Sequence, residues 1–503
     1  MPIITKFINI TSSVRRKKID FFRRNPIQVQ QQQFEWLVKR LKNTSFGSEH
    51  GISSNCSLSD FQNKIEVQDY SGFQPYIERI QRGEKNVLWD SKVRWFAKSS
   101  GTTDSKSKYI PVTNQMLMGS HKQGPKDTVY TYFVNNPNSR MLYGDSLTLG
   151  GSHKIEREGS NILSGDLSAI LIENTPKWIN FKRCPKKSIA LLADFDEKVE
   201  KIYKVAKNKN ITSFAGVPSW NLVMMNKFLE YSGKNNLLEV WPNLEIFLHG
   251  GMNFNPYREL YKQLIPTDNM HYVETYNASE GFFAFADDFA RDDMLLALDY
   301  GTFYEFLAMN DLASPEKAVP LEGVKCGVNY AIIISASNGL WRYMIGDTVT
   351  FTSTNPYRIK ITGRTKHFVN AFGEEIIVDN AERAIRHACD MTNSEIREYS
   401  AAPIYMQGRE KGSHEWVIEF AKSPNNLDAF TDAMDKKLQE INSDYEAKRK
   451  NNTTLLRPTV TVVSKGTFNR WILSTRGKIG GQNKIPRLSN QRDTIEQLIK
   501  CDK

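Results

Sequence analysis

Apolar and polar positions along the chain follow two repeats, one typical of helices and one typical of strands. After Asn25-Pro26, which has the chemistry of a helix start with Asn25 as the N-cap, apolar residues recur on one helix face and stop near Gly47. Between residues 90 and 360, short apolar runs alternate with helical patterns; examples are 93–97, 211–215 followed by a helix through 222–228, and 330–335. Such alternation predicts a mixed α/β architecture.

The pattern changes after Gly363. The elements expected beyond it are a helix capped by Asp379, a strand at 415–421, a polar helix at 427–448 and a strand at 459–464. We therefore expect two domains, a large α/β domain over residues 1–365 and a small α+β domain over residues 366–503.

Composition narrows the class of protein. The 503 residues, 40% of them hydrophobic, suffice for two or three domains with a large core, which excludes a disordered or fibrous chain. No uninterrupted apolar run approaches the ~20 residues that cross a bilayer, so we expect no stable membrane insertion. The five cysteines are dispersed without a C-x-x-C pair, and the first residues lack the pattern of a secretory signal. We expect reduced thiols and a cytoplasmic location.

The net charge of +11 is unevenly distributed. Residues 1–42 hold ten basic and two acidic residues, so most of the excess lies in this N-terminal arm and the rest of the chain is nearly neutral. A duplex-binding protein usually carries a basic face on its folded body, so nucleic acid is not the expected partner. We interpret the arm as a solvated basic helix, with contact to an anionic membrane surface as the alternative.

Small, hydroxyl and basic residues gather in the segment 99–108, Ser-Ser-Gly-Thr-Thr-Asp-Ser-Lys-Ser-Lys. Small residues let backbone N–H groups approach phosphate oxygens, while hydroxyls and lysines add donors and charge. The spacing is not that of a Walker loop, and the residues that follow look extended. This segment alone leaves a phosphate-binding loop and an ordinary surface loop equally open.

Two later segments offer complementary chemistry. Tyr276-Asn277-Ala278-Ser279-Glu280-Gly281 combines an aromatic face, a hydroxyl and a carboxylate able to hold Mg²⁺. Taken alone, this segment would be a turn with an incidental acid. In 341–347, an apolar stretch ends in Gly346-Asp347, whose carboxylate could accept hydrogen bonds from both ribose hydroxyls. Taken alone, it is only a turn signal.

A basic, glycine-containing segment lies near the C-terminus. Between Ser464 and Ser489 there are six lysines or arginines and no acid, and Gly480-Gly481 precede Lys484. A glycine loop that presents one lysine suits a lid that meets a phosphate on closing. A flexible basic tail is the alternative.

The four segments in this order resemble the auxin-responsive-promoter (Gretchen Hagen) family of acyl-acid amido synthetases, within the adenylate-forming superfamily. The likeness covers nearly the whole chain, and further family-like stretches are 33–47, 76–79, 83–89 and 216–220. The resemblance implies the adenylate-forming fold, with a large N-terminal domain and a mobile C-terminal lid. It also implies that ATP and Mg²⁺ are used to adenylate a carboxylic acid, whose acyl group then passes to an amine, usually of an amino acid.

The resemblance also assigns site residues. On the phosphate side it implies the loop residues Ser99, Ser100, Gly101, Thr102 and Thr103, with Lys108 nearby and Lys484 entering for adenylation. On the nucleoside side it implies Tyr276 against the adenine with Asn277 and Ala278 beside it, Ser279 near the α-phosphate, Glu280 on Mg²⁺, Asp347 on the ribose and Arg364 at the hinge.

Other chemistries have little support. There is neither an H-E-x-x-H motif nor a G-x-S-x-G elbow. An acyl-CoA ligase with the same adenylate intermediate is the alternative enzyme, although Thr365-Lys366-His367 stand where such ligases typically carry acids. A non-catalytic membrane- or nucleic-acid-binding protein is the second alternative, and intact Glu280, Asp347 and Lys484 argue against it.

Overall fold

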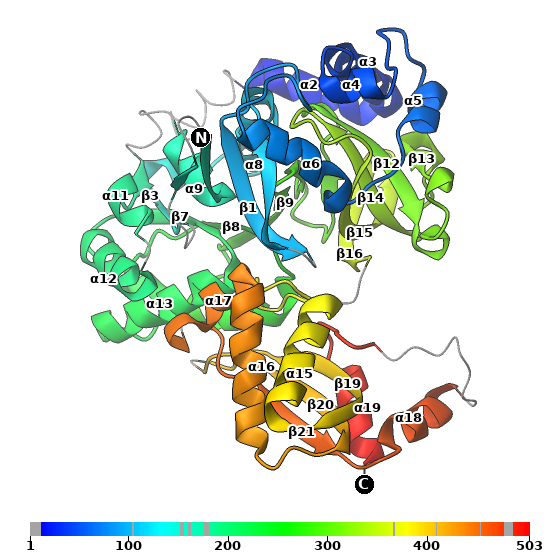
Figure 1. Cartoon of the computed structure of the whole chain (residues 1–503). Helices are drawn as coiled ribbons and strands as arrows, with labels where there is room; N and C mark the ends of the chain where they lie inside the picture. Colours follow the sequence, from blue (N-terminus) through cyan, green and yellow to red (C-terminus); the bar gives the residue numbers. More distant parts are fainter. Residues whose placement is uncertain are drawn as a thin grey trace.

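A computed structural model describes residues 12–102, 105–150, 155–158, 162–175, 182–192, 194–365, 368–408, 410–452, 454–476 and 486–502. Elements up to Arg364 form a large body, and those from Phe368 onward gather in a smaller lobe on one side of it (Figure 1). None of the described helices is long and apolar enough to cross a membrane. All five cysteines are free thiols.

The large body is built on a twelve-stranded sheet, counted over the described residues, in the order β13-β12-β14-β15-β16-β11-β10-β9-β8-β7-β3-β6. Its strands are β3 (Asp145–Thr148), β6 (Arg183–Cys184), β7 (Ile211–Gly216), β8 (Ile246–Gly250), β9 (His271–Ala278), β10 (Gly281–Phe285), β11 (Met294–Leu296), β12 (Thr302–Ala308), β13 (Val319–Pro320), β14 (Asn329–Ala336), β15 (Tyr343–Thr354) and β16 (Tyr357–Arg364). The pairs from β6 to β9 are parallel and those from β9 to β13 antiparallel. The change of direction falls at β9, the strand that carries the Tyr276 segment.

A second, four-stranded sheet has the order β2-β1-β5-β4, with β1 (Trp95–Thr102), β2 (Ser105–Val112), β4 (Glu156–Glu158) and β5 (Ile162–Asp166). The helices of the body are α2 (Ser13–Arg24), α3 (Pro26–Leu41), α4 (Ser45–Glu49), α5 (Leu58–Lys64), α6 (Tyr70–Gln81), α7 (Asn114–Met116), α8 (Gln123–Asn135), α9 (Leu167–Glu173), α11 (Lys187–Ala190), α12 (Phe195–Ala206), α13 (Pro218–Ser232) and α14 (Arg258–Leu264). In Figure 1 the N-terminal helices lie at the end of the body away from the smaller lobe.

The smaller lobe begins with a short hairpin of β17 (Phe368–Val369) and β18 (Ile376–Ile377). A three-stranded sheet follows, with β19 (Glu395–Ile404), β20 (Ser413–Lys422) and β21 (Thr459–Val463), and the helices are α15 (Val378–Thr392), α16 (Leu427–Ile441), α17 (Ser443–Arg449), α18 (Thr467–Arg476) and α19 (Asp493–Cys501). The strand pairs lie on one side or the other of residue 365 throughout the described chain. The domain boundary there stays a prediction.

The two parts share a packed surface. The loop between β17 and β18 sits on α13 and on the residue that precedes α14, and one hydrophobic cluster runs through both parts. Tyr257 donates a hydrogen bond of 2.6 Å to the carbonyl of Ala371, and Ser219 donates one of 3.0 Å to the carbonyl of Phe372. These side chains therefore hold the loop by its backbone.

Three predicted helix limits are wrong, each because a short polar side chain caps the backbone locally. The helix predicted after Asn25-Pro26 ends at Leu41, since the Thr44 hydroxyl accepts from the Gly47 amide and begins α4. The Asn25 side chain donates to the carbonyl of Phe21 instead of capping α3. The polar helix 427–448 is two helices, because Asn442 caps α17 by accepting from the Tyr445 amide. The cap expected from Asp379 is absent.

At that position α15 already begins at Val378, so Asp379 lies in its first turn. The side chain of Asn380 accepts from the amide of Ile377 and supplies the cap.

The expectation of a solvated first helix is also wrong on one face of α2. Ile19 and Phe22 are buried against the body. Arg15 donates to Asp127 over 2.8 Å and is paired with Asp299, and Arg23 is paired with Asp287. The inner face of α2 is thus attached to the body by ion pairs with acids more than a hundred residues away in sequence.

A buried ion pair joins the early helices to the large sheet. Arg342 has a positive φ of 45° and donates two hydrogen bonds of 3.0 Å to Glu305, and it also donates to the carbonyls of Gln62 and Ile65 at 2.9 and 2.8 Å. The side chains of Arg342 and Glu305 are 4% and 1% exposed. Removing one partner would strand the other charge in the core.

We expect Arg342→Met to lower the free energy of unfolding by about 3–5 kcal/mol, since a buried charge loses its partner. Urea unfolding followed by tryptophan fluorescence would measure it. The double variant Arg342→Met, Glu305→Leu should recover part of the loss because no unpaired charge remains. A single variant as stable as the wild type would contradict this account.

Candidate active site

A cavity of about 1210 Å³ lies where the strands around β9 meet the smaller lobe. Its walls include residues from β1, β2, β8, β9, β15 and β16, from α9, and from the segment 488–493 near the C-terminus. Polar and charged side chains from segments far apart in sequence therefore face one space.

The hairpin of β9 and β10 delivers a carboxylate to this cavity. Ala278 pairs with Gly281, so Ser279 and Glu280 form the turn between the two strands. Glu280 is 5% exposed, its carbonyl accepts from Asn338 at 3.1 Å, and its carboxylate accepts from Tyr343 at 3.4 Å. Burial raises the pKa of Glu280, and the charge of Lys108 opposes this rise.

A chain of hydrogen bonds crosses the wall next to Glu280. Tyr276 donates to one oxygen of Asp347 at 2.6 Å, and Arg364 donates to the other at 2.8 Å. Asp347 and Arg364 are paired across β15 and β16, which fixes their spacing. Arg364 also donates to Glu375 at 3.2 Å, from the loop before β18. Each Asp347 oxygen keeps a free lone pair for a further donor.

The hairpin of β1 and β2 forms another side of the cavity. Ser99 and Lys108 are partners in this hairpin and both line the cavity. Burial lowers the pKa of Lys108, while the negative charge of Glu280 acts against that effect. The ammonium and carboxylate thus stabilise each other's charged forms inside a poorly solvated site.

Two buried histidines lie beside the β9 segment. Nδ1 of His121 is 3.3 Å from Oδ1 of Asn277, and burial lowers the pKa of His121 to about 4. His249, a cavity residue, stacks on Phe254 with ring centroids 4.2 Å apart, and Nδ1 of His249 has no hydrogen-bond partner among the described residues. Burial, followed by the charge of Arg258, lowers the pKa of His249 to about 3, so both rings are neutral near pH 7.

Three family models match the chain. Residues 15–270 match the GH3 family N-terminal domain, residues 295–364 the GH3 family central domain and residues 379–493 the GH3 family C-terminal domain. The chain belongs to the GH3 family. The predicted family resemblance is thereby confirmed.

Curated relatives of this GH3 protein are distant but match along most of its length. An indole-3-acetic acid-amido synthetase of Arabidopsis thaliana, GH3.4, is 20% identical, and the match covers 94% of this chain and 90% of the relative. A jasmonoyl-L-amino acid synthetase of Nicotiana attenuata, JAR4, is also 20% identical, with 64% and 66% covered.

Solved structures confirm the predicted fold. The acyl acid amido synthetase AtGH3.15, in complex with 2,4-DB, has a TM-score of 0.61 at 16% identity and covers 96% of this chain and 95% of its own. A 2-hydroxyisobutyryl-CoA ligase has a TM-score of 0.54 at 14% identity, covering 97% and 92%. At these identities the likeness concerns the fold alone, which is that of adenylate-forming enzymes.

Most of the residues predicted for the site of this GH3 protein line the one cavity: Ser99, Lys108, Tyr276, Asn277, Ala278, Ser279, Glu280, Asp347 and Arg364. Ser100, Gly101 and Thr102 continue β1 beyond Ser99. Thr103 and Lys484 lie outside the described residues. Leu488, four residues after Lys484, lines the cavity. The roles assigned to these residues stay predictions.

The sequence analysis missed Glu375, Tyr343 and His249. Tyr343 stands three residues before Gly346 in a segment that was singled out, so its proximity to Glu280 could have been suspected. Glu375 follows Gly373-Glu374, a turn signal beyond Arg364. It has a φ of 44°, and its carboxylate accepts a hydrogen bond from Arg364. His249 precedes Gly250-Gly251, and only the fold shows that it faces the cavity.

The residues present fit ATP and Mg²⁺. No group of three or more metal-ligating side chains occurs in the part of the chain that the structure describes. Mg²⁺ on ATP needs few protein ligands, since phosphate oxygens and water complete its shell. The Glu280 carboxylate and Lys108 both line the cavity. Asp347, which accepts a hydrogen bond from Tyr276, can accept further hydrogen bonds.

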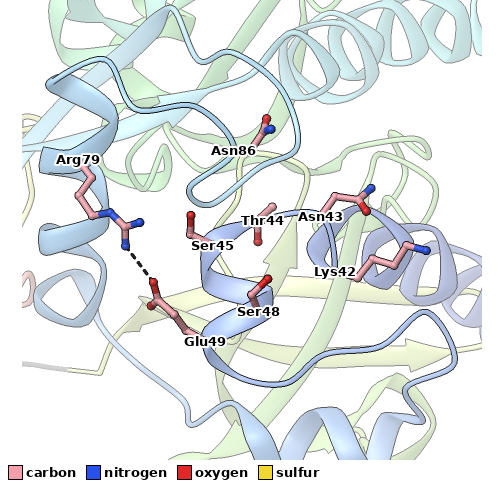
Figure 2. Close-up of a pocket in the computed structure, with 8 residues that line it drawn as sticks. All are labelled: Lys42, Asn43, Thr44, Ser45, Ser48, Glu49, Arg79 and Asn86. Carbon is pink, nitrogen blue, oxygen red and sulfur yellow. Dashed lines mark hydrogen bonds and ion pairs between the residues drawn. The ribbon is translucent and has the colours of Figure 1, made fainter.

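A second, open depression of about 520 Å³ lies on the outer helices and shares no lining residue with the cavity (Figure 2). It is lined by polar residues around the start of α4, and the ion pair of Arg79 with Glu49 spans one side of it. The short α4 and the paired charges give it no evident ligand chemistry.

The neutral histidines predict a pH dependence of stability. Because the pKa of His249 is about 3 in the folded protein and ~6.5 when unfolded, only the unfolded chain takes up this proton between pH 6 and 5. Stability is therefore lost as the pH falls below 6.5. His249→Phe keeps an aromatic ring against Phe254. We expect its free energy of unfolding to fall by about 1 kcal/mol less than that of the wild type between pH 6 and pH 5.

Urea unfolding at pH 6 and pH 5 would measure the difference. An unchanged dependence on pH in His249→Phe would show that this histidine is not held neutral.

Proposed function

We propose that this chain is an ATP-dependent acyl-acid amido synthetase. In the first half-reaction, an oxygen of a carboxylate attacks the α-phosphorus of ATP, and pyrophosphate leaves to give an acyl-adenylate. In the second, the amine of an amino acid, the acceptor named for the jasmonoyl relative, attacks the acyl carbon. The amine loses a proton, AMP leaves and an amide remains.

The observation that carries this proposal is the convergence of Lys108, Glu280, Asp347 and Arg364 on one cavity in a GH3-family fold. A carboxylate and a triphosphate repel each other, so the enzyme must neutralise charge while holding both groups in line. Lys108 supplies a positive charge from the middle of the β1–β2 hairpin, where it pairs with Ser99 and lines the cavity. Mg²⁺, when held by Glu280, supplies further positive charge to the phosphates.

The nucleoside side of the proposal rests on the Asp347 network. Tyr276 and Arg364 each occupy one lone pair of the Asp347 carboxylate, which fixes its plane. The remaining lone pairs can accept hydrogen bonds from the two ribose hydroxyls, and the Tyr276 ring offers a face to the adenine. Lys484, to which the family resemblance assigns the adenylation step, precedes the cavity residue Leu488 by four positions in the sequence.

ATP–pyrophosphate exchange across a panel of aryl, indolyl and aliphatic acids would test the first half-reaction. The active acid is then incubated with ATP and either a mixture of amino acids or coenzyme A, and the product is identified by mass spectrometry. Acid-dependent exchange followed by an amide supports the proposal. A thioester would instead identify an acyl-CoA ligase, and exchange with no acid despite ATP binding would contradict adenylation by these acids.

A further inference from the structure

Within the described residues the chain begins with α2, which uses its basic residues in two different ways. Those on its inner face form ion pairs with the body: Arg15 with Asp127 and Asp299, and Arg23 with Asp287. Val14, Lys17, Lys18, Phe21 and Arg24, which we name the outer stripe, are all exposed. They follow one another at intervals of three, one, three and three residues, which places them along one face of a helix.

The outer stripe combines free charge with exposed apolar surface. In the described part of the chain, no side-chain hydrogen bond or ion pair involves Lys17, Lys18 or Arg24. Val14 is 68% exposed and Phe21 is 42% exposed, and Ile27, at the start of α3, is 37% exposed. What distinguishes Val14 and Phe21 is that they share one exposed helix face with three cations, so a single partner could contact both kinds of side chain.

We propose that the outer stripe of α2 is a docking surface for an anionic lipid bilayer. A helix that lies in the plane of a membrane interface buries its apolar side chains among the acyl chains and directs lysines to the headgroup phosphates. The body beyond residue 42 is nearly neutral, so the attraction arises at this helix. The ion pairs of Arg15 and Arg23 fix α2 on the body, so docking needs no rearrangement.

The composition of the stripe favours lipid over nucleic acid. Contacts to phosphates of a duplex need cations but gain nothing from Val14 or Phe21, whereas an interface buries both. Three cations, each worth about a fivefold gain in affinity near an anionic surface, give reversible binding that weakens with salt. The proposal concerns attachment at the surface, and it is independent of the chemistry in the cavity.

Sedimentation of the full-length protein with phosphatidylcholine vesicles, with and without phosphatidylserine, tests the proposal. We expect binding only to the anionic vesicles, reduced by raised salt. Lys17→Glu with Lys18→Glu should weaken it at least tenfold, since two attractive charges become repulsive. Phe21→Ser should weaken it at constant charge.

The matched control is Lys201→Glu with Lys204→Glu on α12, which makes the same change of net charge at two exposed lysines elsewhere. The control should bind vesicles like the wild type, and amide formation without vesicles should be unchanged in all variants. Equal loss in the control, no binding to anionic vesicles, or tighter binding to duplex DNA that Phe21→Ser leaves intact would overturn the proposal.

Discussion

Replacing Glu280 by Gln should reduce ATP–pyrophosphate exchange by about 10²–10³-fold, the range for removal of one preorganised charge-stabilising group from an active site. Glutamine keeps the volume and can still accept the hydrogen bond from Tyr343. What is lost is the negative charge that faces Lys108 and that fits Mg²⁺. Without it, Lys108 loses one of the charges that oppose the effect of burial on its pKa, so the positive charge near the phosphates is less stabilised as well.

The same argument predicts that Glu280 and Lys108 act through each other. The double variant Glu280→Gln, Lys108→Gln should show ATP–pyrophosphate exchange only slightly slower than that of the slower single variant. The effects of substitutions at residues that share one function are not additive. Circular dichroism and the thermal midpoint control for folding. Exchange within a few fold of the wild type in Glu280→Gln, with the fold intact, would remove this carboxylate from the proposed site.

Local motifs explain why much of the site could be predicted. Tyr276 and Glu280 lie within one hairpin, and Asp347 and Arg364 face each other across two paired strands, so short segments of sequence already contain the geometry. The alternation of apolar runs likewise predicted the mixed α/β class because each strand buries its own residues. Such features depend on near neighbours in the chain.

What could not be predicted depends on distant neighbours. The solvated first helix was wrong because Arg15 meets Asp127 and Asp299, acids that carry no local signal of their partner. Glu375 was missed for the same reason, since only the packing of the β17–β18 loop brings it to Arg364. Asn442 shows a third limit: one cap residue inside a helical pattern splits it without disturbing the apolar repeat.

Replacing Lys484 by Ala should remove most of the adenylation activity and leave the second half-reaction nearly intact. In the proposed function this lysine neutralises charge as carboxylate and triphosphate meet, a contribution of about 10²–10³-fold for one such group. Amide formation from a ready-made acyl-adenylate has no triphosphate to neutralise. ATP–pyrophosphate exchange measures the first step, and amide release from synthetic acyl-adenylate with the amino acid acceptor measures the second.

Lys478→Ala is the matched control, because it removes the other lysine of the segment 477–485. It should retain both half-reactions within a few fold. The difference between the two variants follows from position along the chain: Lys484 is four residues from Leu488 on the cavity wall, whereas Lys478 is ten residues from it. Equal losses in both half-reactions for Lys484→Ala would indicate a structural role, and equal exchange in Lys484→Ala and Lys478→Ala would refute the assignment of this lysine.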